Sequence, residues 1–263
     1  MKFPYERYQT LTEPCKIYYP TGEDTQARWV VQTINNASKL LMKLLTQPTP
    51  QLEILLVATD DWDRAPLEDT EELEQPKRFL PYWTDAIQPS CLVIPSELDP
   101  IIGEPTQAKL AILLYHELMR AFLEYDPRPW PDEYPLWADE WQVHFAALWL
   151  AQQIDGQQGI VTKDLREHYA ELFVPEEDGK TPITVRGFDW DDETSPQDYL
   201  RFDLLLEQFA ADLLEHSDPE LLPRFLALYR KEQSVLLSDD VTEMLATALG
   251  PGGTEWLDEL VYF

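Results

Sequence analysis

The chain has 263 residues, of which 44% are hydrophobic and 12% aromatic, enough to build a sizeable core and to exclude a disordered protein. Its 49 acidic residues outnumber 20 lysines and arginines, so the formal net charge is −29. A surface this negative repels phosphate backbones and anionic lipids. We therefore expect neither nucleic acid nor a membrane as a partner, but a protein or peptide of basic character.

The first ten residues, MKFPYERYQT, lack the apolar stretch of a secretory signal. No run in the chain approaches the roughly 18 apolar residues that a membrane helix requires. The two cysteines, Cys15 and Cys91, lie far apart and in no metal-type spacing. These features favour a soluble, cytoplasmic protein without a disulfide.

Short apolar runs predict three strands in the N-terminal half, at residues 15–20, 52–58 and 91–94. Between the first two, apolar residues recur at helical spacing, so we expect a helix from near Glu23 to Leu44, closed by Pro48. The acidic segment 60–76 has no periodic apolar face and is predicted to be a surface loop.

Helical periodicity dominates from residue 106 onward. It predicts helices over 106–125, 135–154, 161–173, 196–216, 219–232, 239–249 and 254–261. An acidic loop is expected at 174–194, between the third and fourth of these helices. Ser195-Pro196 supplies the N-cap and first turn of the longest one. Strands first and helices afterwards predict an α+β fold. We expect a mixed-sheet N-terminal lobe with helices, residues 1–125, an all-helical C-terminal lobe, residues 126–263, and a cleft near the central helices.

Two neighbouring predicted helices carry the candidate catalytic and metal-ligating residues. His116, Glu117 and Arg120 lie on the first, and Glu140 and His144 on the second. Positions i and i+4 of a helix share a face, so His116 and Arg120 lie on one face of the first helix, and Glu140 and His144 lie on one face of the second. If the two helices pack antiparallel across these faces, all five side chains converge.

This pair of helices resembles the gluzincin metallopeptidases, the thermolysin-like and aminopeptidase-like zinc enzymes. In that family one helix carries His-Glu-x-x-His, with two zinc ligands around a general-base glutamate. The next helix carries the third ligand in a segment like Trp137-Ala-Asp-Glu140, at a similar spacing. The resemblance implies a zincin-like fold, with His116 in the first-ligand position, Glu117 in that of the general base and Glu140 in that of the third ligand.

The sequence departs from the family where the second histidine belongs, because Arg120 stands there. A guanidinium has no lone pair to donate and repels a cation, so no metal is expected. Without an ion, Glu117 and Glu140 face each other unneutralised. We therefore expect Arg120 to replace the metal electrostatically by bridging the helices through Glu140 and also contacting Glu117.

Two alternatives stay open at this point. His116, Glu140 and His144 form a His-Glu-His trio that holds zinc if Arg120 turns away. The resemblance also extends to the helix at 196–216, where active relatives carry an oxyanion-stabilising tyrosine. Counting back from Pro219 puts Phe202 there, and a one-turn shift puts Tyr199 there instead.

The favoured function is that of a catalytically inactive metallopeptidase-like protein that binds a peptide or protein, with His116, Arg120, Glu140 and His144 in the binding site and no cofactor. The alternative is an active zinc-dependent peptidase or hydrolase with Glu117 as its base, in which metal-bound water attacks a peptide-like carbonyl. A structural or assembly protein with a vestigial cleft is the third class.

Overall fold

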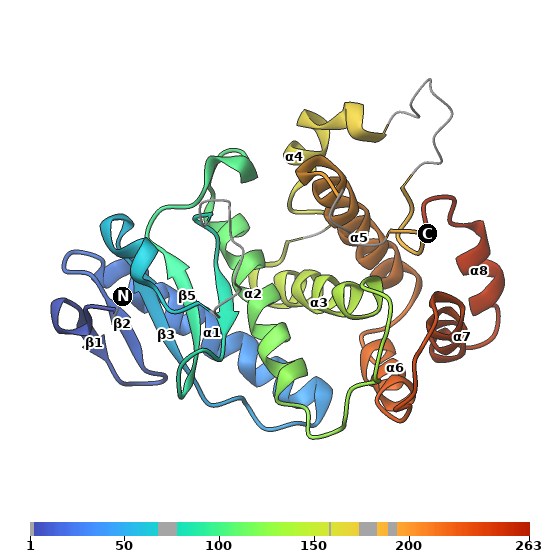
Figure 1. Ribbon diagram of the computed structural model, residues 1–263, viewed down its shortest axis with the longest axis horizontal. Helices are drawn as coiled ribbons and strands as arrows, with labels where there is room; N and C mark the ends of the chain where they lie inside the picture. The colour runs from blue at the N-terminus through green and yellow to red at the C-terminus, as the bar shows by residue number, and fades with distance from the viewer. Residues whose placement is uncertain (1–2, 68–77, 158, 174–182, 189–193) are drawn as a thin grey trace. The chain divides into compact units, whose positions relative to one another are not determined.

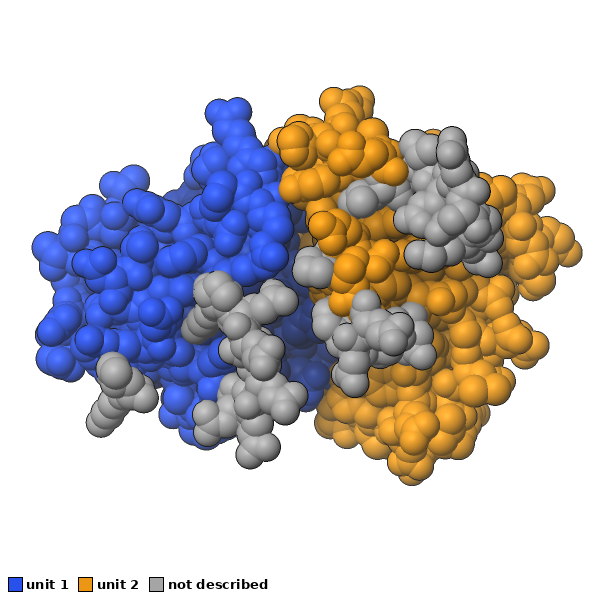
Figure 2. Space-filling view, turned by 45° about the horizontal axis from the view of Figure 1, so that its top comes forward, with its two compact units in different colours: residues 1–125 blue, residues 126–263 orange. Residues whose placement is uncertain are grey.

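The computed structural model describes residues 3–67, 78–157, 159–173, 183–188 and 194–263. The chain divides into two compact units, residues 1–125 and residues 126–263 (Figures 1 and 2). Unit 1 contains a sheet and helices, and every regular element described in unit 2 is a helix. An α+β fold with an N-terminal sheet and a helical C-terminal part is thereby confirmed.

Unit 1 is built on a five-stranded mixed sheet in the order β1-β2-β3-β5-β4. Its strands are β1 (Gln9–Leu11), β2 (Ile17–Tyr19), β3 (Leu52–Val57), β4 (Tyr82–Thr84) and β5 (Ser90–Pro95). The three central strands, β2, β3 and β5, run parallel, and the strands at the two edges are antiparallel to their neighbours. Parallel strands are covered on both faces, which explains the continuous apolar runs of β3 and β5.

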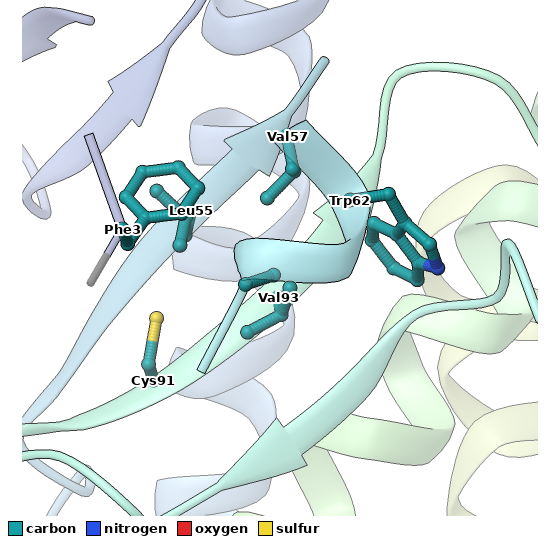
Figure 3. Packing of buried hydrophobic residues seen from close by; sticks show 7 residues of the cluster. Phe3, Leu55, Val57, Trp62, Cys91 and Val93 are labelled. Carbon is teal, nitrogen blue, oxygen red and sulfur yellow. The ribbon is translucent and has the colours of Figure 1, made fainter. Parts of the chain in front are cut away.

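Each face of the sheet has its own apolar layer, because successive side chains of a strand point to opposite faces. On one face, Leu55 and Val57 of β3 pack with Cys91 and Val93 of β5, and Phe3, Trp62 and Ala65 complete the cluster (Figure 3). On the other face, Ile54 and Leu56 of β3 and Leu92 and Ile94 of β5 are also fully buried.

Two α-helices are described in unit 1 (Figure 1). α1 (Asp24–Leu45) carries its buried residues at helical spacing and ends at Thr46, which adopts a left-handed conformation. α2 (Gln107–Glu124) packs beside α1 and also lies against β4. Both helices therefore form where the apolar periodicity predicted them.

Two features of unit 1 differ from the sequence prediction. The three-residue edge strands β1 and β4 are too short to show a pattern. Residues Thr59–Arg64 form a 3₁₀ helix whose Trp62 is 1% exposed, so the predicted surface loop is wrong there. The buried Trp62 side chain outweighs the acidic composition of this segment, because burying a large aromatic side chain is strongly stabilising. Residues 68–76 of the predicted loop lie outside the described residues.

Unit 2 contains α3 (Trp137–Leu150), α4 (Lys163–His168), α5 (Pro196–His216), α6 (Leu221–Tyr229), α7 (Ser238–Leu249) and α8 (Gly253–Glu259). α3 continues as a π-helical turn over Ala151–Asp155, and α4 is followed by a 3₁₀ turn. α5 begins with a full capping box between Ser195 and Asp198, as the Ser195-Pro196 start predicted. The predicted loop at 174–194 is described only at residues 183–188 and 194.

Aromatic side chains form much of the core of unit 2. Trp141 packs edge-on against Phe145 and Phe225, and Trp137 packs edge-on against the C-terminal Phe263. The backbone of Arg186 donates a hydrogen bond to the Phe263 carbonyl, which anchors the end of the chain. The core thus spans α3, α6 and the C-terminal residues. Across the described part of the chain, no helix combines the length and apolar character needed to span a membrane.

Candidate functional site

Three of the predicted site residues lie on α2 in unit 1. The helix begins after Thr106, whose hydroxyl accepts a hydrogen bond from the backbone N–H of Lys109. Its apolar face is fully buried, as Leu114 and Leu118 show. The side chains of His116, Glu117 and Arg120 are 18%, 13% and 33% exposed. All three are therefore partly buried, with some access to solvent.

Both carboxylate oxygens of Glu117 have hydrogen-bonding partners within unit 1. Oε1 lies 3.1 Å from Nδ1 of His116. Oε2 accepts the backbone N–H of Trp83 in β4 at 2.9 Å, and Nε of Arg120 lies 3.9 Å from it. The carboxylate therefore links α2 to the edge strand of the sheet and is flanked by two cationic or hydrogen-bonding side chains.

These contacts determine the acidity of Glu117. Burial by itself raises the pKa of a carboxyl group, but here the His116 hydrogen bond, the Arg120 charge and the Trp83 N–H outweigh burial and lower the pKa of Glu117 below its ordinary value. An effective general base at neutral pH has a pKa near 7. Glu117 is thus held as a stable carboxylate with a weak tendency to take up a proton.

The other two predicted ligands lie on α3 in unit 2. Glu140 is in the first turn of α3, where the helix dipole favours a negative charge. His144 follows one turn later on the same face and is 8% exposed. A carboxylate oxygen of Glu140 and a ring nitrogen of His144 lie within 4.8 Å of each other. The expected i, i+4 juxtaposition of these two side chains is therefore present.

His144 also contacts α5. Its Nε2 lies 3.2 Å from Oδ1 of Asp203, whose side chain is 43% exposed. Burial lowers the pKa of a histidine, but the hydrogen bond and charge of Asp203, with the charges of Glu140 and Glu207, outweigh burial and raise the pKa of His144. The imidazole is therefore stabilised in its protonated form, and a protonated ring must lose its proton before it binds a metal.

Glu207, one turn after Asp203 on α5, anchors the segment that precedes α4. It accepts hydrogen bonds from the backbone N–H groups of Val161 and Thr162 at 3.2 and 3.4 Å, and from the Thr162 hydroxyl. Burial is the main cause that raises the pKa of Glu207, and the Thr162 hydrogen bond and the charge of His144 oppose it. The residue thus ties two segments of unit 2 together next to His144.

The two candidates for the oxyanion position have different environments on α5. Phe202 is 1% exposed and stacks on Phe188 at a centroid distance of 4.2 Å. Tyr199 is 41% exposed and precedes Asp203 by one helical turn, so both lie on the same face of α5. Tyr199 is therefore the candidate that shares a helix face with the partner of His144.

The fit of these residues to zinc can be tested within each unit. Nδ1 of His116 and Nε2 of His144 each face a carboxylate, an arrangement that orients the opposite ring nitrogen toward a ligand. A catalytic zinc ion needs three protein ligands. Among the described residues, neither unit by itself brings three ligating side chains together, and unit 1 adds the fixed charge of Arg120. Neither unit alone fits a catalytic zinc site.

The described residues thus bring together His116, Glu117 and Arg120 in unit 1, and Glu140 and His144 in unit 2. Sequence reasoning missed the Trp83 backbone, Asp203 and Glu207. The spacing of Tyr199, Asp203 and Glu207 at i, i+4 and i+8 was the available signal, because it places the three polar side chains in one row along the helix.

No protein-family model matches the chain, and no curated protein matches it significantly. A functional proposal therefore rests on the geometry within each unit and on the resemblance of the two helical motifs.

Proposed function

We propose that the protein is a catalytically inactive, metallopeptidase-like protein of zincin-like fold, which acts in the cytoplasm by binding a peptide or a segment of a partner protein with basic character. The net charge of −29 supports the basic character, because it attracts cationic partners over a distance and repels anionic ones.

The main support for this proposal is that both carboxylate oxygens of Glu117 already have partners in the protein. A general base must reach a water molecule and accept its proton, but both oxygens of this carboxylate are committed to Trp83, His116 and Arg120. Its pKa is lowered. In this chain Glu117 serves better as an anchor of α2 than as a base.

Arg120 supports the same conclusion, because it disfavours metal binding. Its guanidinium cannot coordinate a cation, and its positive charge near Glu117 supplies part of the neutralisation that an ion provides in an active enzyme. Replacement of a metal by a protein charge is consistent with retained binding and lost hydrolysis.

The alternative is an active zinc-dependent peptidase in which His116, Glu140 and His144 are the ligands and Glu117 is the base. The orientation of each histidine by a carboxylate, Glu117 for one and Asp203 for the other, favours it. When bound, zinc supplies a Lewis acid and an activated water. This alternative requires ligands from both units.

Metal analysis and a gain-of-ligand variant distinguish the two functions. We expect the purified protein to carry little zinc, and Arg120→His to bind zinc at least about tenfold more tightly, because it adds a third ligand to His116 and Glu140. Arg28→His, on the exposed face of α1, is the matched control and leaves zinc affinity unchanged. Affinity is measured by competition with a chromogenic chelator.

Two results contradict the proposal. Near-stoichiometric zinc that chelators remove from the wild-type protein supports the active enzyme, especially if added peptides are cleaved and Glu117→Gln stops the cleavage. No gain of affinity in Arg120→His contradicts the descent from a zinc site.

A further inference from the structure

An exposed apolar surface lies in unit 2 on two segments outside the candidate site. Tyr134 is 38% exposed, Val235 51% and Leu237 66%. Single exposed apolar residues are ordinary on a protein surface, whereas several gathered in one place indicate an interaction site.

Two hydrogen bonds hold the segments side by side. The backbone N–H of Leu236 donates to the carbonyl of Glu133 at 2.8 Å, and Nε1 of Trp137 donates to Oγ of Ser238 at 2.9 Å. Leu236 is buried at 6% exposure, and neighbours in extended chain point to the opposite side. Val235 and Leu237 therefore face solvent together, next to the segment that carries Tyr134.

Aromatic packing makes the base of this surface rigid. Tyr134 stacks on Trp130 at a centroid distance of 5.5 Å and packs edge-on against the buried Tyr229. The guanidinium of Arg230, a residue only 2% exposed, lies 3.1 Å from the centroid of the Trp130 ring. A surface fixed in this way loses little conformational entropy when a partner binds.

The surroundings of the apolar residues are strongly acidic. On the same two segments and the turn after α6, the exposed acids Asp132, Glu133, Glu232, Asp239 and Asp240 outnumber one exposed cation, Lys231. Arg186 forms an ion pair with Asp239, and Asp240 accepts the backbone N–H of Leu237, so Asp132, Glu133 and Glu232 are the acids of this rim best placed to meet a partner's cations. An apolar centre with a charged rim is the usual anatomy of a protein interface. We call Tyr134, Val235, Leu237 and these five acids the apolar–acidic surface.

We propose that the apolar–acidic surface docks an amphipathic segment of a partner protein, whose apolar side chains cover Tyr134, Val235 and Leu237 and whose lysines or arginines pair with the acidic rim. The surface contains none of the candidate site residues on α2 and α3, although Trp137 of α3 helps to position one of its segments. The proposal stands whether or not those candidate residues catalyse a reaction.

A designed probe tests the proposal on the full-length protein. The probe is a fluorescein-labelled amphipathic peptide of leucine and lysine, long enough for about four helical turns, and binding is measured by fluorescence anisotropy at about 0.15 M salt. We expect Val235→Ser/Leu237→Ser to weaken binding by about tenfold or more. Met42→Ser/Val261→Ser, which removes exposed apolar side chains elsewhere, is the matched control and leaves affinity within about twofold.

A second variant and a mapping experiment separate apolar docking from charge attraction. Asp132→Asn/Glu133→Gln/Glu232→Gln should weaken binding and reduce its salt dependence. In the wild-type protein, NMR shifts on peptide addition should concentrate at residues 132–134 and 235–240. Unweakened binding by the serine variant, or shifts elsewhere, overturns the proposal. So does a wild-type dimer that Leu237→Ser dissociates, since the occupant is then a second copy. None of these outcomes changes the zinc result for Arg120→His.

Discussion

A glutamate in a helical His-Glu motif can act as a base or as a structural anchor, and its neighbours decide which. In this chain Glu117 accepts from the Trp83 backbone and lies beside His116 and Arg120. The same residue type in unit 2, Glu207, has its pKa raised by burial, while contacts lower that of Glu117. The residue type in a sequence motif therefore predicts where a glutamate lies on its helix better than it predicts the protonation state of its carboxyl group.

Asp126, at the start of unit 2, gives a pH-dependent prediction. Its side chain is 2% exposed and accepts hydrogen bonds from the backbone N–H and Nε of Arg128. Burial raises its pKa, but the Arg128 contacts outweigh burial and lower it. A lowered folded-state pKa means that the carboxylate stabilises the protein above its unfolded pKa near 3.8, and that this contribution is lost as the pH falls through the folded value.

We expect Asp126→Asn to lower the free energy of unfolding at pH 7 by about 1–3 kcal/mol, as for other buried hydrogen bonds to charged groups. At about pH 3 we expect a smaller loss, because the contribution of the carboxylate declines as the pH falls below its unfolded-state pKa. Urea unfolding followed by tryptophan fluorescence measures both values. Asp132→Asn, at an exposed position of the same loop, is the control. An equal loss at both pH values contradicts the assigned cause.

At the scale of elements, the helices were the predictable part of the fold. Long periodic runs placed α1, α2 and α5 within a few residues of their observed bounds, and the Ser195 cap also marked the start of α5. Edge strands of three residues have no pattern to read, because their position depends on pairing with β2 and β5. The contact between His144 and Asp203 could not be predicted from the sequence either, because only the packing of α3 on α5 creates it.

The α2–β4 connection gives a prediction at this scale. In the described part of the sheet, β4 is an edge strand, and alternate N–H groups of an antiparallel edge point away from its neighbour. At Trp83 the outward N–H is taken by Glu117. We expect Glu117→Ala to speed hydrogen exchange at the Trp83 amide by about tenfold or more. Glu117→Gln keeps an acceptor oxygen and should retain part of the protection. Exchange at Trp83 that is equally fast in the wild-type protein contradicts this role.

For the whole molecule, charge is the dominant property. An excess of 29 negative charges creates repulsion in the folded state that extends beyond any single ion pair. The ion pairs described are mostly at least partly exposed to solvent, such as Arg224 with Asp218 and Lys16 with Glu53. Exposed pairs of this kind stabilise by about 0–1 kcal/mol each, so they do not offset repulsion spread over the surface.

Screening should therefore stabilise this protein. At pH 7 we expect the melting temperature to rise by about 2–8 °C between about 10 mM and 0.5 M sodium chloride, which corresponds to about 1–2 kcal/mol for a chain of this size. Calorimetry measures the shift. The control is the same salt series near pH 4, close to the sequence pI of about 4.2, where the net charge approaches zero and the salt effect should shrink. A melting temperature that falls with salt at pH 7 would mean that attractive ion pairs, rather than net repulsion, govern the electrostatics of the fold.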